Sequence, residues 1–164
     1  MKKIKSFMMM TMAAMAFVCG MSSCSSSDDD APETPVADQL AGSYAGVRYI
    51  TIMGDVDDPD NVSYQFTKTS DSSVDMIIPK SGESGMMVIP ALTVKNIPLK
   101  KNSNVISGEM ASYNGTVTGS DGNEKSFTIT NLAIIYSDKD IAVSYTLKYG
   151  NMPFDMETVF TGSK

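Results

Sequence analysis

The sequence predicts an all-β protein, and the favoured architecture is a single antiparallel up-and-down barrel of about eight to ten strands. Apolar and polar residues alternate with a period of two along most of the chain, and short polar turns separate the alternating stretches. No stretch after residue 36 shows the apolar period of a helix. A barrel is favoured because closure removes exposed strand edges, and a β-sandwich is the alternative.

The first 23 residues have the pattern of a signal peptide. Lys2, Lys3 and Lys5 precede an apolar run over residues 7–18. That run is shorter than the roughly 20 residues needed to cross a bilayer. We therefore expect residues 1–23 to be removed during export.

Cys24 is the expected lipid-attachment site. It follows Met21, Ser22 and Ser23, which form a lipobox-like string with a small residue directly before the cysteine. Two or more acyl chains on this residue would hold the protein stably on a membrane. The alternative is an ordinary secretory signal, with cysteines that pair or stay free in the mature chain.

Residues 24–37 are expected to form a flexible acidic tether, followed by a barrel domain over residues 38–164. The tether is polar, contains proline and has no apolar period. Its Cys-Ser-Ser-Ser-Asp-Asp-Asp string resembles the export signal of Bacteroidetes-type lipoproteins. That resemblance implies a lipid-anchored protein of the outer membrane, exposed at the cell surface, whereas a plain solvated linker is the alternative interpretation.

Strand parity predicts which side chains face the interior. The expected inward residues are Val62, Tyr64, Phe66, Val74, Met76, Ile78, Ile141, Val143, Tyr145, Leu147, Tyr149, Phe154, Met156, Thr158 and Phe160. Parity changes between Ile129 and Leu132, so a β-bulge is expected near Thr130 and Asn131. Turn residues occur at 71–73, 120–123, 137–140 and 150–151.

The two ends of the domain resemble the calycin-like, or lipocalin-like, β-barrel lipoproteins of gut Bacteroidetes. The resemblance rests on Leu-Ala-Gly-Ser-Tyr-Ala-Gly at residues 40–46, Tyr-Thr-Leu-Lys-Tyr-Gly-Asn-Met-Pro-Phe at 145–154, and Phe-Thr-Gly at 160–162. Lipocalins carry a Gly-X-Trp signature where this chain has Gly42, Ser43 and Tyr44, and the chain contains no tryptophan. The resemblance therefore implies a fold and a location more than a function.

A barrel with a lumen would line it with apolar side chains and a few tyrosine hydroxyls. The candidate ligand-binding residues are Tyr64, Phe66, Met76, Tyr136, Tyr145, Phe154 and Met156. The same side chains would equally fill a solid core. Arg48 is the eighth candidate, because an inward guanidinium would stack on an aromatic ring or meet an anionic ligand. The alternative is an Arg48 that reaches solvent, since both faces of its strand are apolar.

Residues 54–61 place four carboxylates close together, a pattern that suggests calcium. An EF-hand frame begun at Asp55 fails, however. It places Pro59 at the fifth position, Asp60 where glycine is needed and Phe66 where an acid is needed. We expect an exposed acidic loop and no metal site, with a weak calcium site as the alternative.

Composition argues against catalysis. The chain has no histidine, which excludes histidine-based triads and histidine-ligated zinc. Asp155 and Glu157 have a spacing compatible with a carboxylate pair, but their parity places them on the outer face. The Gly-rich residues 81–85 lack the lysine of a phosphate loop. We expect no enzymatic activity and no cofactor.

Two functions remain. One is a barrel that binds a small apolar or amphipathic ligand, and the other is a filled-core surface scaffold or interaction module that contacts glycans or partner proteins. Nucleic acid is an unexpected partner, because 19 acidic residues outnumber 13 basic ones. The remaining expected partner is the membrane, through the acylated cysteine.

Overall fold

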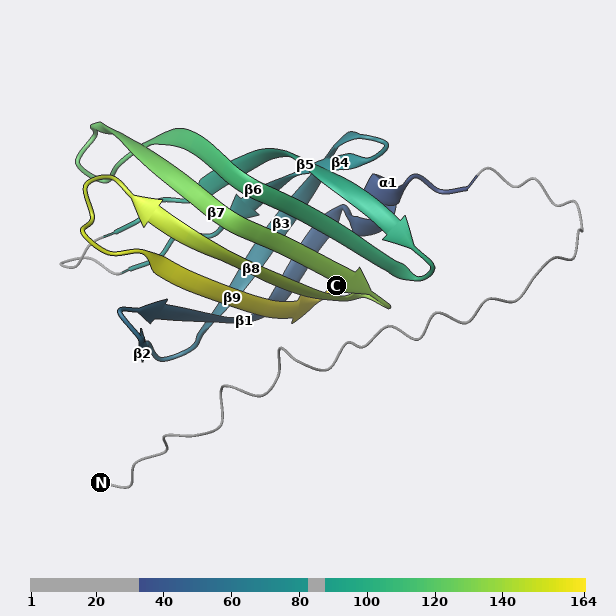
Figure 1. Ribbon diagram of the computed structural model, residues 1–164, viewed down its shortest axis with the longest axis horizontal. Coiled ribbons are helices and arrows are strands. Elements are labelled where there is room, and N and C mark those ends of the chain that lie inside the picture. The colour runs from purple at the N-terminus through teal and green to yellow at the C-terminus, as the bar shows by residue number, and fades with distance from the viewer. Residues whose placement is uncertain (1–32, 83–87) are drawn as a thin grey trace, which may run out of the picture. The chain divides into compact units, whose positions relative to one another are not determined.

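Strands dominate the computed structural model, which describes residues 33–82 and 88–164. The elements are α1 (Val36–Leu40), β1 (Gly42–Ile52), β2 (Asp55–Val56), β3 (Asp60–Ser70), β4 (Ser73–Ile78), β5 (Leu92–Asn102), β6 (Val105–Thr118), β7 (Glu124–Ser137), β8 (Asp140–Tyr149) and β9 (Met156–Ser163). Successive strands are antiparallel neighbours, and β1 also pairs with β9, so eight strands close into a barrel (Figure 1). The short β2 extends the sheet beside β1. The predicted up-and-down barrel is confirmed.

Strand β1 closes the barrel because it pairs with a different strand on each side. Its first part pairs with β3 from Gly42 to Arg48, and its later part pairs with β9 from Ala45 to Ile52. Gly46 lies opposite Gly162 in the second pairing. A Cβ on Gly46 would collide with the backbone of Thr161 and Gly162, so the close approach of β1 and β9 requires glycine there.

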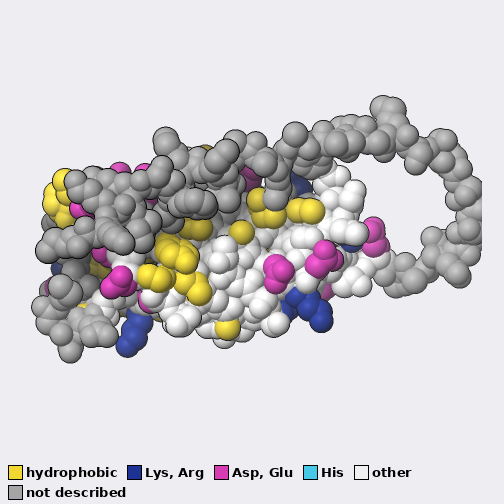
Figure 2. Space-filling model, turned by 90° about the horizontal axis from the view of Figure 1, so that it is seen from below, with side chains coloured by type: hydrophobic (Ala, Val, Ile, Leu, Met, Phe, Trp, Pro, Cys, Tyr) yellow, Lys and Arg dark blue, Asp and Glu magenta, His cyan; other side chains and the backbone are white. Residues whose placement is uncertain are grey.

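The predicted alternation is confirmed in the strands for which it was stated. Tyr64, Met76, Val143 and Phe160 are all at most 1% exposed, and the intervening residues of their strands are half-buried or exposed. On the face drawn in Figure 2, hydrophobic side chains appear in small separate patches among polar and charged groups. Most large apolar residues of this barrel therefore face its interior, and the exposed ones are Met53, Val56, Val105, Ile135 and Val159 among the described residues.

The bulge predicted near Thr130 and Asn131 is confirmed by a register shift between β7 and β8 at this point. Asn131 has a φ of 54°, a left-handed conformation that asparagine tolerates. A second bulge in β5 was not predicted. There Asn96 has a φ of 55°, and its backbone N–H donates a hydrogen bond to Asp75 Oδ1 at 2.8 Å.

Strands β5 and β6 pair over only four residues each, from Leu99 to Asn102 and from Val105 to Gly108. Beyond them the two strands diverge and leave a hollow of about 390 Å³. Tyr113 and Phe127, whose side chains belong to the inner face, line this hollow. The wall of the barrel is therefore thinnest at this seam.

One short helix corrects the prediction that the chain contains none after residue 36. Five residues span little more than one turn, so no apolar period can develop in α1. Ala37 and Leu40 are nevertheless fully buried against the barrel, and the Ala37 N–H donates to the Asp71 carbonyl at 3.1 Å. In the residues that the structure describes, no helix is long and apolar enough to cross a membrane.

Candidate functional site

The two ends of the barrel differ in how their strands are connected (Figure 1). We call one the helix end: it carries α1 and the short turns at residues 71–72, 103–104 and 138–139. We call the other the loop end: it carries the longer connections at residues 53–59, 119–123 and 150–155, and the described residues 79–82 and 88–91 between β4 and β5. Binding residues occur disproportionately on loops that a rigid scaffold holds in place, so the loop end is the first place to look for a site.

The helix end is closed by packing and hydrogen bonds. The Tyr44 hydroxyl donates to the Leu40 carbonyl at 2.7 Å, and Lys164 Nζ donates to the Gln39 carbonyl at 2.8 Å. The Lys164 ammonium also lies 5.3 Å from the centroid of the Tyr44 ring and 5.6 Å from that of Tyr136, within the range of cation–π attraction. These contacts fasten α1 and the end of β9 over the interior.

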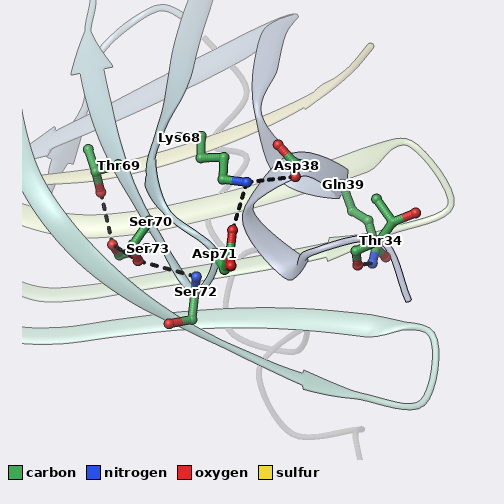
Figure 3. Close-up of polar contacts among 9 residues, drawn as sticks. All are labelled: Thr34, Asp38, Gln39, Lys68, Thr69, Ser70, Asp71, Ser72 and Ser73. Atoms are coloured by element: carbon green, nitrogen blue, oxygen red, sulfur yellow. Dashed lines mark hydrogen bonds and ion pairs between the residues drawn. The ribbon is translucent and has the colours of Figure 1, made fainter. Parts of the chain in front are cut away.

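Surface ion pairs add to the closure of the helix end (Figure 3). Lys68 Nζ on β3 lies 2.8 Å from Asp38 Oδ2 on α1 and 2.8 Å from Asp71 Oδ1 in the β3–β4 turn. The Gln39 side-chain amide donates to the Thr34 carbonyl at 2.7 Å. The Lys68–Asp38 pair ties the helix to β3, the Lys68–Asp71 pair fixes the same lysine to the turn, and the Gln39 bond holds the segment before the helix.

Inside the barrel, the predicted ligand-binding residues contact one another. The rings of Tyr64 and Phe160 stack with their centroids 4.2 Å apart, and the hydroxyls of Tyr64 and Tyr145 are 2.8 Å apart. Tyr44 packs edge-on against Phe66, at 5.5 Å between centroids. Side chains in these contacts fill the space that a ligand would need.

The structure separates the seven aromatic and methionine candidates into three groups. Five of them lie together in the core: Tyr64, Phe66, Met76, Tyr145 and Met156. Tyr136 is half-buried at the helix end, 5.9 Å from the Tyr44 ring. Phe154 precedes β9 and lines a separate hollow of about 380 Å³ at the loop end.

Arg48, the eighth candidate, points inward and is only 2% exposed, so the solvent-reaching interpretation is wrong. Its Nε donates to Asp60 Oδ1 at 3.1 Å and its Nη2 to Asp60 Oδ2 at 2.5 Å. Its remaining bonds go to the Pro79 and Lys80 carbonyls at 3.2 and 3.3 Å. Sequence parity alone left the direction open because both faces of β1 are apolar.

The carboxylate of Asp60 already neutralises the guanidinium of Arg48. An anionic ligand would have to replace a fork of two charge-assisted hydrogen bonds, which are stronger than neutral ones. Burial also raises the pKa of Tyr64 and Tyr145, so both hydroxyls stay protonated beside this pair at neutral pH. The arrangement is a balanced polar cluster at the edge of the core, with Arg48 buried and Asp60 partly exposed.

The acidic stretch is confirmed as an exposed loop except at its end. Asp55, Asp57 and Asp58 are exposed, whereas Asp60 starts β3 and bonds to Arg48. No group of three or more His, Cys, Asp or Glu residues within residues 33–82 and 88–164 is arranged to hold a metal ion. Asp155 and Glu157 are exposed, as their parity predicted.

A second hollow at the loop end, of about 410 Å³, falls within the size range of ligand sites. We call it the Tyr149 pocket. It is lined by Val88, Gly119, Ser120, Asp121, Lys125, Tyr149, Gly150, Asn151, Met152 and Pro153. Asp121 and Lys125 form an ion pair at 2.8 Å, which lowers the pKa of Asp121 and raises that of Lys125.

The hydroxyl of Tyr149 distinguishes this pocket. Tyr149 is 5% exposed, and its buried hydroxyl has no hydrogen-bond partner among the described residues. Burial has the largest effect on the pKa of Tyr149 and raises it. The charge of Lys125 lowers this pKa, and the charge of Asp121 raises it. The hydroxyl is therefore protonated at neutral pH.

Comparison with known proteins finds a likeness of fold. No family model and no curated protein matches the chain. A crystal structure of a putative outer membrane protein from Bacteroides fragilis NCTC 9343 is similar, with a TM-score of 0.60 and 18% sequence identity. The likeness covers 80% of this chain and 53% of that protein, so this chain spans about half its length.

Sequence reasoning missed the Tyr149 pocket. Tyr149 was expected to face inward with four other residues of its strand, and residues 120–123 and 150–151 were interpreted only as turns. The available signal was the proximity of two polar turns to a tyrosine at a strand end. Nothing in the chain order shows that those turns meet, because they lie on different hairpins.

Proposed function

We propose that this protein is a lipid-anchored, surface-exposed outer-membrane protein whose packed barrel presents its loop end to molecules outside the cell. One observation carries the proposal: the residues expected to line a lumen pack on one another and form the core. A filled barrel is a rigid scaffold, and its loops are then the variable part that contacts partners.

Polar outer faces support an anchor made of lipid. A membrane-spanning barrel presents an apolar band outward, whereas this barrel buries most of its large apolar residues inside. Acyl chains on Cys24, which lies outside the described residues, would supply the membrane attachment. The Bacteroides fragilis protein of similar fold is itself described as a putative outer membrane protein, which agrees with this location.

Location and anchoring are tested together. Cells that express the full chain are labelled with radioactive palmitate, and a Cys24→Ala variant is the control. We expect label on the wild-type protein only, and loss of the barrel when intact cells are treated with protease. Unlabelled wild-type protein would contradict the anchor, and protease resistance on intact cells would contradict surface exposure.

A second candidate function is favoured by the seam between β5 and β6. The hollow there reaches inner-face side chains, including Tyr113 and Phe127, so a small apolar ligand could enter the wall of the barrel. Mass spectrometry of an organic extract of the purified protein separates the two functions. The scaffold predicts no stoichiometric ligand, and one bound lipid per chain would favour the ligand-binding barrel.

A further inference from the structure

The seam between β5 and β6 leaves a long strand edge without a partner. Strand β6 pairs with β7 from Ile106 to Thr118, but it pairs with β5 over only four residues. From Glu109 to Thr118 it has no partner strand on its β5 side among the described residues. The N–H and C=O groups of successive residues point to opposite sides of a strand, so every second residue here directs both groups toward the seam. Such an edge is a template for another strand.

The two edges of the seam differ in how well they are protected. On β5, the bulge at Asn96 breaks the edge, Pro98 has no N–H to donate, and Lys95 places a charge beside it. The edge of β6 has none of these features, because no charged residue and no proline occurs from Met110 to Thr118. The edge of β6 is therefore the one that is open to pairing.

The chemistry of this edge indicates what kind of molecule occupies the seam. A row of backbone N–H and C=O groups is matched by another extended backbone, as in the addition of a peptide strand to a sheet. Sugars and lipids lack this repeat. The hollow in the seam measures about 390 Å³, and the half-buried side chains of Tyr113 and Val117 line it. An extended peptide with apolar side chains on its inner face fits both features.

The charge at the seam indicates the other face of that peptide. Among the described residues, Lys95 is the only charged one that lines the hollow, and it is exposed and forms no ion pair. A carboxylate would supply its counter-charge. Side chains of a strand alternate between the two faces, so residues that flank the inward apolar ones point outward, on the side of Lys95. An alternation of apolar and acidic residues is therefore complementary to the seam.

We propose that the edge of β6 between Tyr113 and Val117 binds an extended peptide segment of a partner protein as an added strand, in which apolar and acidic residues alternate. The inference rests on the proposed function, because β5 begins and β6 ends at the loop end that the anchored scaffold presents to other molecules (Figure 1).

Binding is measured by NMR titration of the isotope-labelled full chain in detergent. The probe is the capped peptide Val-Asp-Val-Asp-Val, and one comparison peptide has Lys in place of Asp. We expect saturable binding of the acidic peptide and weaker binding of the basic one. The net charge of −6 favours the basic peptide at long range, so a preference for the acidic peptide requires a local cause. No saturable binding, or a preference for the basic peptide, would overturn the proposal.

Backbone pairing is tested by a third peptide, the acidic probe methylated at the backbone nitrogens of its third and fourth residues. Adjacent residues point to opposite edges, so each edge of the peptide loses a donor while side chains and charge are kept. We expect affinity to fall at least tenfold. In the complex with the unmethylated probe, hydrogen exchange should slow at alternate amides between Tyr113 and Val117. Equal affinity of the methylated peptide, or no slowing in β6, would contradict strand addition.

Lys95→Glu tests the charge at the seam. We expect the acidic peptide to bind about two- to fivefold more weakly, as for an exposed ion pair, and the basic peptide to bind more tightly. Lys100→Glu is the matched control, because it makes the same change in net charge at an exposed position of β5 outside the hollow. Equal effects of the two variants would contradict a contact with Lys95.

Other occupants of the seam give different results. A dimer in light scattering that the acidic peptide dissociates would assign the edge to a second copy of the chain, and a stoichiometric lipid in the organic extract would assign the hollow to lipid. Either result overturns the peptide. Absent peptide binding with a palmitate-labelled, protease-accessible chain leaves the anchored scaffold in place. Peptide binding by a chain without palmitate removes the anchor and leaves strand addition in place.

Discussion

The helix end and the loop end of this barrel each contain a buried tyrosine, but the hydroxyls of the two tyrosines differ in their hydrogen bonding. At the helix end, the hydroxyl of Tyr44 donates to a helix carbonyl, and a lysine lies over its ring. At the loop end, the hydroxyl of Tyr149 is buried without a partner among the described residues, beside an ion pair. The first tyrosine has a hydrogen-bond partner within the fold, and the second has none among the described residues.

Buried polar groups explain why the difference matters. A satisfied hydroxyl contributes to folding, whereas an unsatisfied one costs stability until something binds it. The loop end also holds the ion pair of buried Arg48 and partly exposed Asp60, which connects β1, β3 and the segment after β4. Structure at the loop end thus depends on a charged cluster, and structure at the helix end depends on packing.

The largest effect is expected from Asp60→Asn. It leaves the guanidinium of Arg48, which is 2% exposed, without its counter-charge. We expect the free energy of unfolding to fall by about 3 kcal/mol, the low end for a buried charge that loses its partner, because Asp60 itself is partly exposed. Urea denaturation measures the loss, and Asp58→Asn in the same loop is the matched control. Equal stability of the two variants would show that the pair does not hold the loop end.

Leu40→Ala tests the packing of the helix end. Leu40 is fully buried, so the variant loses apolar contact and leaves a cavity beneath α1. We expect a loss of about 2 kcal/mol in the free energy of unfolding, the low end for Leu→Ala, because a five-residue helix can settle into the cavity. Gln39→Ala, one residue earlier and only half-buried, is expected to be nearly neutral. A small loss in Leu40→Ala would mean that α1 covers the barrel without stabilising it.

Alkaline pH tests how Tyr64 and Tyr145, which lie in the core between the two ends, contribute to stability. Burial raises the pKa of Tyr64 and Tyr145 in the folded protein, whereas in the unfolded chain these hydroxyls ionise near pH 10, at about the ordinary tyrosine pKa. Their contribution is therefore fully present below about pH 10 and is lost as pH rises above it.

Each of these two tyrosines is expected to lower the free energy of unfolding by up to about 1.4 kcal/mol per pH unit in that range. Urea denaturation at increasing pH gives the slope, and tyrosinate absorbance reports the ionisation. Tyr64→Phe is expected to reduce the slope. An unchanged slope in this variant would exclude Tyr64 as a source of the pH dependence.

The smallest effects are expected from two Tyr→Phe substitutions, one at each end of the barrel. Tyr44→Phe leaves the Leu40 carbonyl without its donor, and we expect a loss of about 1 kcal/mol. Tyr149→Phe removes an unpartnered hydroxyl, so we expect no loss or a gain in stability. Differential scanning calorimetry compares the two. The contrast between the ends would be wrong if both variants were destabilised equally.

Much of the fold could be predicted because strand parity is local. Residues 141–149 and 156–160 alternate without interruption, and both appear as strands with the predicted faces. The bulge near Asn131 was visible as a change of parity. Strands β5 and β6 were harder to recognise because the β5 bulge at Asn96 interrupts its alternation and the inward parity of β6 shifts between Met110 and Tyr113.

The sequence by itself determined the barrel class, the inward faces of most strands and the expectation of a lipid anchor at Cys24. Only the tertiary structure decided that the interior is packed, that Arg48 meets Asp60 and that two distant turns enclose Tyr149. The alternation of apolar and polar residues involves only neighbours along the chain, so it can be recognised in the sequence. Partners across the barrel are set by closure and register, which bring together residues that are far apart in the sequence.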